Sequence, residues 1–565
     1  MNDLPGTLDQ LTARLETLEK RVYVLEHPSV VSQESEANAT PRYETVEDRS
    51  LAQTGGLFSI VGRAMLGIAG AYVLRAVAES TPLPKLAFAA IAIAYAILWL
   101  VWAVRVKAAS WVPSAIYAGT SAVILTPMLW ELTLSFKVLA PSASAAILAI
   151  FVLTASALAW KHNLTPVLWV VNAMAAAAAL GLAIASRQLI PFISALLLMA
   201  VICEFAAKLN HGSSVRPLVA VAADVAIWAL IFIYTGPQDA RVDYPVLGMA
   251  ALLVPGCALF LIYAASAGAG TILHRKNITV FETFQPVIAF LLAASSVLYF
   301  EPHLGPMYLG AACLVLAAAC YALALTAFSG VSATRATRNY QVFLAWGTGL
   351  LLAGSLLCLP TLGVTLCLGV SAIASVLLGI RLNRLTLQVH GLVLLVSAAV
   401  SSGLAGYVFH TLAGTLPITF TASICIAAVS TLVFYGADKP AVSETWAPRS
   451  LRVVSAALAV CAAAAFLVQG LLFLMALRMT LDVYHIAFIR TLTCCAMALS
   501  LAFSGSRWNR KELTNIAFAI LAFVAAKLVF EDLRHGRFEF IAGSIFLFAI
   551  SLIGVPRLAR MGQKV

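Results

Sequence analysis

Ionisable side chains interrupt several apolar stretches of this chain, and a charge in hydrocarbon is costly enough to mark a candidate functional site. Arg490 lies about two turns inside such a stretch, where its guanidinium needs a carboxylate, such as Asp482 or Glu531, or a phosphate. Lys527 and Glu531 are four residues apart on one helical face and can neutralise each other. Since arginine binds phosphate and a carboxylate can act as a general base, this chemistry suits a lipid-linked phosphate or sugar.

A larger set of polar residues is expected at the outer ends of membrane spans. If the first, sixteenth and seventeenth spans pack together, these residues form an extracytoplasmic pocket with both cations and carboxylates. Salt bridges at the rim of a helical bundle are the alternative interpretation. The predicted outer-face cluster consists of Arg75, Glu79, Glu131, Asp482, His485, Arg490, Lys527, Glu531 and Asp532.

A second group of polar residues is expected near mid-membrane. Asp224 lies in the middle of the span 214–235 and needs a partner, a water-filled cavity or a proton. Asn172 and Gln469 lie at a similar depth and could hydrogen-bond to Asp224 or to each other across helices. The group is either polar contact between helices or a proton or substrate site. Closer to the cytoplasmic ends, where snorkelling or an interhelical pair suffices, lie Arg63, Glu204, Glu282 and His390.

The elements that position these residues are membrane spans. Of the 565 residues, 62% are apolar and 11% are charged, against roughly 25% charged residues in a soluble domain. Unbroken apolar runs of about twenty residues predict helices that cross hydrocarbon, and the chain is expected to be an all-α polytopic bundle of about eighteen spans. The predicted spans are 57–78, 83–104, 110–130, 142–160, 164–185, 189–206, 214–235, 244–265, 279–299, 305–328, 340–358, 361–380, 386–408, 417–436, 451–477, 483–503, 510–530 and 537–555.

The distribution of positive charge predicts the orientation of these spans. With a cytoplasmic N-terminus, 25 of the 36 Lys and Arg residues fall on the inner side, seven on the outer side and four within spans. This asymmetry predicts that both termini are cytoplasmic. The net charge of +11 therefore orients the protein in a bilayer, and no nucleic-acid partner is expected.

The N-terminal region has a different pattern. Residues 1–27 carry a heptad seam that predicts a short cytoplasmic coiled coil and self-association, with a lone amphipathic helix at the membrane surface as the alternative. Residues 28–54 are polar and predict a flexible linker. The transmembrane domain is expected over 55–556 and a basic cytoplasmic tail over 557–565. The predicted oligomerisation residues are Leu8, Leu11, Leu15, Leu18, Val22 and Leu25.

Two segments at the ends of the membrane domain carry a family resemblance. The stretch GGLFSIVGRAMLGIAGAYVLRAV and the later KLVFEDLR with FIAGSIFLFAISL resemble the opening and closing spans of a family of bacterial multi-pass membrane proteins, domain of unknown function 2339. The segment Leu57-Phe58 departs from the Asn-Trp of that pattern. The resemblance implies a bacterial inner-membrane protein and brings no activity with it. The matching residues are Gly55, Gly56, Arg63, Gly67, Gly70, Arg75, Lys527, Asp532, Leu533 and Gly543.

Several kinds of chemistry leave no trace in the sequence. The P-loop, dinucleotide-binding, H-E-x-x-H and G-x-S-x-G signatures are absent, and the ten cysteines lack zinc-site spacing, so no cofactor or metal is expected. The glycines of 347–349 and 403–406 lie in apolar runs and predict close helix packing.

Three classes of function remain. The first is a transporter- or flippase-like protein for an amphipathic or lipid-linked substrate. The second is a non-catalytic membrane scaffold assembled through the coiled coil. The third is a membrane enzyme acting on a lipid-linked substrate at the outer face, which the short outer loops disfavour.

Overall fold

The computed structural model describes residues 59–73, 76–77, 85–105, 112–162, 164–209, 213–328, 334–414, 420–437, 446–478, 480, 482–535 and 537–561. The predicted coiled coil with its six seam residues, the linker, Arg75 and Glu79 lie outside these ranges. The chain consists of two compact units, residues 1–124 and 125–565.

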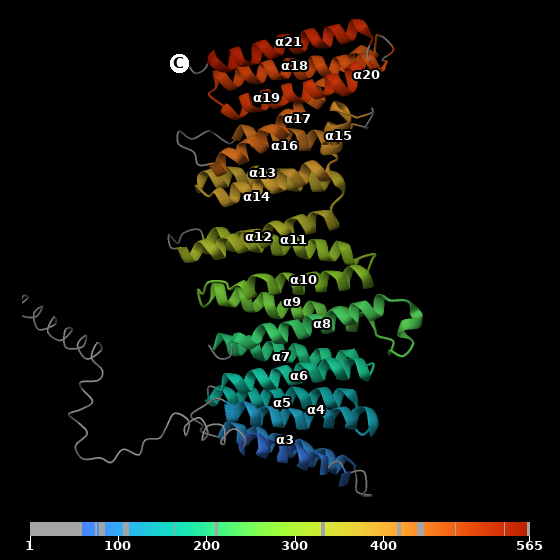
Figure 1. The fold of residues 1–565 in the computed structure, drawn as a ribbon, viewed down its shortest axis with the longest axis vertical. Coiled ribbons are helices and arrows are strands. Elements are labelled where there is room, and N and C mark those ends of the chain that lie inside the picture. Colours follow the sequence, from blue (N-terminus) through green and yellow to red (C-terminus); the bar gives the residue numbers. More distant parts are fainter. Residues whose placement is uncertain are drawn as a thin grey trace, which may run out of the picture. The chain divides into compact units, whose positions relative to one another are not determined.

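All regular structure in the described residues is helical (Figure 1). Long runs of Ala and Leu favour helix, and in hydrocarbon a helix satisfies its own backbone hydrogen bonds. The helices, with short 3₁₀ and π segments marked η, are α3 (Lys85–Arg105), α4 (Val112–Trp130), η1 (Glu131–Ser135), α5 (Pro141–His162), α6 (Thr165–Ala185), α7 (Leu189–Lys208), η2 (Ser213–Val215), α8 (Arg216–Thr235), η3 (Gln238–Arg241), α9 (Met249–Ile272), α10 (Val280–Phe300), α11 (Gly305–Ala327), α12 (Thr334–Cys358), α13 (Thr361–Arg381), α14 (Leu385–Ser401), α15 (Leu404–Leu412), α16 (Ala422–Ala437), α17 (Trp446–Ala476), α18 (Val483–Arg507), α19 (Lys511–Lys527), η4 (Leu528–Asp532), α20 (Leu533–His535) and α21 (Phe538–Met561).

The prediction of a membrane protein built from helices is confirmed. In the described residues, 14 helices are long and apolar enough to cross a membrane, and the bent pair α14 and α15 adds one more if it forms a single span. Three further predicted spans correspond to shorter apolar helices, Ser59–Val73, Ala89–Ala103 and Ala422–Ala437. The count of eighteen spans therefore stays a prediction.

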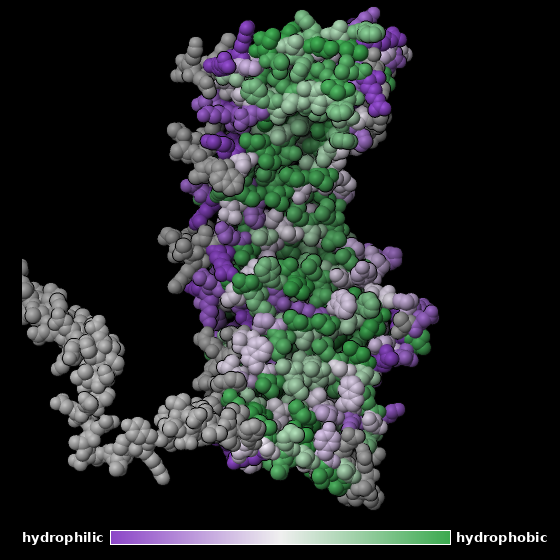
Figure 2. All heavy atoms as spheres, in the orientation of Figure 1, coloured by the Kyte–Doolittle hydropathy of each residue, from purple (hydrophilic) through white to green (hydrophobic). Residues whose placement is uncertain are grey.

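The surface of the second unit has the polarity that a bilayer requires. Figure 2 shows hydrophobic residues along the middle of its helices and hydrophilic residues near the helix ends. Large apolar side chains such as Trp228, Val315 and Phe473 are more than half exposed, which is costly in water and favourable in lipid.

In the first unit, the helix Ser59–Val73 packs on α3 through two glycines of the family resemblance. Gly67 lies against the ring of Trp99, and its carbonyl accepts a hydrogen bond of 3.1 Å from the Tyr95 hydroxyl. A β-carbon at Gly70 would lie 2.8 Å from that hydroxyl oxygen. Both positions therefore need glycine so that the aromatic residues of α3 can approach the helix backbone.

In the second unit, the most extensive contacts join helices that are neighbours or near neighbours in the sequence. The closest pairs are α9 with α10, α11 with α12, α13 with α14, and α18 with α19 and α21 (Figure 1). Small residues permit this close packing, as at Gly310, whose hypothetical β-carbon would lie 2.7 Å from the Cys358 β-carbon.

A sharp bend separates α14 from α15. The two helices meet at 66°, and Gly403 between them has a φ of 82°, in the left-handed region that favours glycine. The prediction of close packing at this segment is wrong for Gly403 and Gly406, because a β-carbon at either position would have no neighbour within 4 Å. For the other predicted segment, 347–349, close packing is confirmed at Gly347, which lies against Tyr321. A β-carbon at Gly349 would also have no neighbour within 4 Å.

Candidate functional site

The strongest candidate site lies between α15, α18, α19 and η4. Arg490 comes from the second turn of α18, Lys527 is the last residue of α19, and Glu531 and Asp532 belong to the π-helical segment η4. Arg490, Lys527 and Asp532 are 3%, 6% and 2% exposed, so their charges must be compensated within the protein.

The π-helical segment explains how Lys527 and Asp532 meet. A π-turn aligns residues five apart, and the Lys527 Nζ lies 2.5 Å from the Asp532 Oδ1. The same Nζ donates to the Ala487 carbonyl at 2.8 Å and to the Thr491 hydroxyl at 2.9 Å, while that hydroxyl donates to the Asp532 Oδ2 at 2.8 Å. The three donors of Lys527 are thus used in a buried network that joins α18 to α19.

Arg490 holds the end of α15. Its Nε donates to the Thr411 carbonyl at 2.7 Å, and its Nη2 donates to the carbonyls of His410 at 3.1 Å and Gly414 at 2.6 Å. These carbonyls belong to the last residues of α15 and the turn after it, and a cation there complements the helix dipole.

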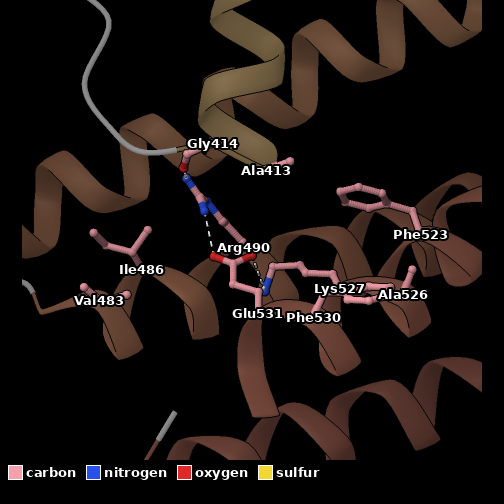
Figure 3. A pocket seen from close by; sticks show the side chains of 10 residues that line it. All are labelled: Ala413, Gly414, Val483, Ile486, Arg490, Phe523, Ala526, Lys527, Phe530 and Glu531. Atoms are coloured by element: carbon pink, nitrogen blue, oxygen red, sulfur yellow. Dashed lines mark hydrogen bonds and ion pairs between the residues drawn. The ribbon is translucent and has the colours of Figure 1, made fainter. Parts of the chain in front are cut away.

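Glu531 lies between the two cations. Its Oε1 accepts from the Arg490 Nη1 at 2.7 Å, and its Oε2 lies 3.4 Å from the Lys527 Nζ. Its side chain is 21% exposed, against 3–4% for the side chains of Lys527 and Arg490. Figure 3 shows the carboxylate of Glu531 between the two basic groups at the wall of a pocket. Of the two carboxylates, Glu531 is therefore the one available to a ligand.

This charged pocket has a volume of about 670 Å³ and is mostly apolar apart from the three charged side chains. Its lining residues are Ala413, Gly414, Val483, Ile486, Arg490, Phe523, Ala526, Lys527, Phe530 and Glu531. A cavity of this size and composition can hold a small polar group beside apolar surface.

A second cavity of about 630 Å³, the apolar groove, lies between α15, α17, α18 and α19. Apart from Asn515, its lining residues are apolar or sulfur-containing, among them Val408, Leu412 and Val460. Ala413 and Phe523 line both cavities, so the two adjoin.

The other predicted outer-face residues are not part of the charged pocket. Asp482 and His485 cap the start of α18, where the Asp482 side chain also accepts from the Tyr484 hydroxyl. Glu131 begins the π-helical segment η1 after α4. The predicted cluster is thus reduced to Arg490, Lys527, Glu531 and Asp532 among the described residues.

Asp224, near the middle of α8, has a partner that the sequence did not indicate. The Gln285 Nε2 of α10 donates to both carboxylate oxygens of Asp224, at 2.9 and 3.0 Å. Asn172 instead donates to the Leu168 carbonyl at 2.8 Å, and Gln469 lies on α17. A glutamine in an apolar run is the signal that could have identified this pair.

The sequence also did not identify Arg216, at the start of α8, as the cation of a buried ion-pair network, although Glu204 and Glu282 were expected to snorkel or to form interhelical pairs. Its Nε donates to the Glu204 Oε1 at 2.8 Å and its Nη2 to the Glu204 Oε2 at 2.5 Å. Its Nη1 lies 3.1 Å from the Glu282 Oε1, and Ser266 donates to Glu204. This network joins α7, α8, α9 and α10 through charge-assisted hydrogen bonds.

We expect the free energy of unfolding of the Asp224→Asn variant to lie within about 1 kcal/mol of that of the native protein, because the asparagine keeps the shape and an acceptor for Gln285. Asp224→Leu should be less stable by about 1–3 kcal/mol, because it leaves the buried Gln285 amide without its partner. Tryptophan fluorescence during thermal unfolding in detergent measures both. Equal free energies of unfolding for the two variants would show that the Asp224–Gln285 contact contributes nothing to stability.

A proton-coupled activity that survives Asp224→Asn would remove Asp224 from any proton pathway.

No metal site emerges from this geometry. In the part of the chain that the structure describes, no group of three or more His, Cys, Asp or Glu side chains is placed to hold a metal ion.

Comparison with protein-family models, with curated proteins and with solved structures finds no match for the chain. Membership of the family that its two terminal spans resemble therefore stays a prediction, and the geometry of the pocket and groove carries the functional argument.

Proposed function

We propose that the chain is a transporter- or flippase-like protein of the bacterial inner membrane, with cytoplasmic termini, that handles an amphipathic or lipid-linked substrate. The observation that carries this proposal is the junction of a charged pocket with an apolar groove at Ala413 and Phe523. A polar head group fits beside Arg490 and Glu531 in the charged pocket, hereafter the head-group pocket. A hydrocarbon chain fits the apolar groove, hereafter the acyl groove, where its burial is favourable at about 25 cal/mol per Å².

The bend between α14 and α15 supports transport over simple binding. The residues of α15 line the acyl groove and Ala413 after it lines both cavities, while Gly403 at its start is a position where the backbone can change direction. Discontinuous helices at a binding site are a recurring feature of membrane transporters.

Two tryptophan substitutions on α19 test the proposal. Ala519 lines the acyl groove, whereas Ala522 is exposed on the same helix and lines neither cavity. We expect Ala519→Trp to lower the occupancy of a discrete co-purified amphipathic molecule by about tenfold or more, because the indole fills the groove. Ala522→Trp should leave the occupancy unchanged.

Native mass spectrometry of the full chain released from lipid nanodiscs measures this occupancy. A discrete lipid-phosphate or glycolipid mass that disappears in Ala519→Trp alone supports the proposal. Retention of bulk phospholipid only, with no difference between the two variants, would contradict it and favour a scaffold. The unfolding temperature of each variant shows that the fold is retained.

A further inference from the structure

We propose that the head-group pocket selects a zwitterionic head group, whose phosphate binds Arg490 and whose ammonium binds Glu531. This inference rests on the proposed function and specifies its substrate class. It depends on the charge balance of the pocket and on which hydrogen-bonding groups remain available there.

The charges at the pocket cancel. Arg490, Lys527 and Glu531 line the pocket, and Asp532 lies behind Lys527; the ion pairs Arg490–Glu531, Lys527–Glu531 and Lys527–Asp532 link two positive and two negative charges. The remaining lining residues of the pocket are uncharged. A ligand with a net charge would thus place an uncompensated charge in a mostly apolar cavity, which is unfavourable.

Only two charged groups can exchange partners for a ligand. Lys527 uses its three donors on Ala487, Thr491 and Asp532. The Nε and Nη2 groups of Arg490 are held by backbone carbonyls. The Nη1 group of Arg490 and the carboxylate of Glu531 remain, and they bind each other at 2.7 Å.

A phosphate can therefore replace Glu531 at the Nη1 of Arg490 while the three carbonyl contacts keep the guanidinium in place. The displaced carboxylate retains only Lys527 as a neighbouring cation, and Lys527 is already paired with Asp532, so one positive charge cannot compensate both carboxylates. An ammonium on the same head group supplies the missing cation. A purely anionic head group would instead bring a second negative charge next to Glu531.

The test compares two lysophospholipids that share one acyl chain and differ in the head group, phosphoethanolamine or phosphoglycerol. Their dissociation constants for the full-length protein in detergent are measured by titration in native mass spectrometry. We expect the zwitterionic lipid to bind about tenfold more tightly than the anionic one, because like-charge contact at a desolvated site is strongly unfavourable.

Glu531→Gln should reverse this order. The glutamine keeps the shape and an acceptor for Arg490, but the pocket becomes positively charged, so the anionic lipid gains affinity and the zwitterionic lipid loses it. Because loss of folding cannot raise affinity, the gain for the anionic lipid is specific. Glu301→Gln is the matched control: it removes the same charge after α10, outside the pocket, and should leave the order unchanged.

The outcomes separate the two proposals. If neither lipid binds the native protein or Glu531→Gln, the proposed amphipathic substrate is wrong. If both lipids bind but the native protein prefers the anionic one, or Glu531→Gln lowers both affinities equally, the head-group inference alone is overturned. A reversal in Glu301→Gln as well would attribute the effect to overall charge and overturn it too.

Discussion

Replacing Lys527 by Met is expected to lower the free energy of unfolding by about 3–5 kcal/mol, the usual effect of removing one partner of a buried ion pair. The methionine has a similar length but leaves Asp532, which is 2% exposed, with only the Thr491 hydroxyl. The Ala487 carbonyl also loses the Lys527 ammonium, the shorter of its two side-chain donors. Chemical or thermal unfolding in detergent measures the change.

Two further variants define the cause. Lys511→Met removes a positive charge from an exposed position on the same helix and should change stability by less than about 0.5 kcal/mol. Lys527→Met with Asp532→Asn removes both charges and should recover part of the loss, because a neutral pair needs no compensating ion. If the double variant is less stable than Lys527→Met, the buried charge of Asp532 is not the reason for the loss.

Replacing Arg216 by Met is expected to lower the free energy of unfolding by a similar amount, about 3–5 kcal/mol. Glu204, which is 4% exposed, would keep only the Ser266 hydroxyl, and the carboxylate of Glu282 would remain nearby without its cation. Two carboxylates without a cation at a helix interface repel each other and are poorly solvated.

Arg216→Lys should have a smaller effect, about 1–3 kcal/mol, because lysine keeps the charge but cannot donate to both oxygens of Glu204 and to Glu282 in the same geometry. The guanidinium also lies 4.9 Å from the centre of the Phe281 ring, a contact for which arginine is better suited. Arg381→Met, at an exposed position, is the control and should be nearly neutral. An Arg216→Met variant as stable as this control would show that the network does not stabilise the bundle.

Hydropathy predicted most of the fold because each span is nearly uniform along its length, so that its existence depends on composition alone. Local backbone changes were not predictable in the same way. The π-turn that brings Asp532 to Lys527 has no side-chain signature, and the i,i+4 spacing favoured Glu531 as the partner instead. The break at Gly403 was hidden by an apolar run that continues on both sides of it.

The candidate site was predictable in part for a related reason. An arginine two turns inside an apolar run must find an anion, which identified Glu531 as a candidate partner of Arg490. The three carbonyls that hold the same guanidinium belong to residues about 80 positions earlier in the chain, and backbone acceptors carry no sequence signal. Asp224 was likewise identified from its depth, whereas its partner Gln285 depends on which helices pack together.

The packing of helices on their sequence neighbours has a consequence for biosynthesis. Because contacts such as α9 with α10 and α11 with α12 are local in the chain, each helical hairpin can bury its interface soon after both of its helices have entered the bilayer. Folding can thus follow translation from the N-terminal side of the second unit. The head-group pocket needs α15, α18, α19 and η4, so it is completed only after η4 has reached the bilayer, later than the hairpins that precede it in the chain.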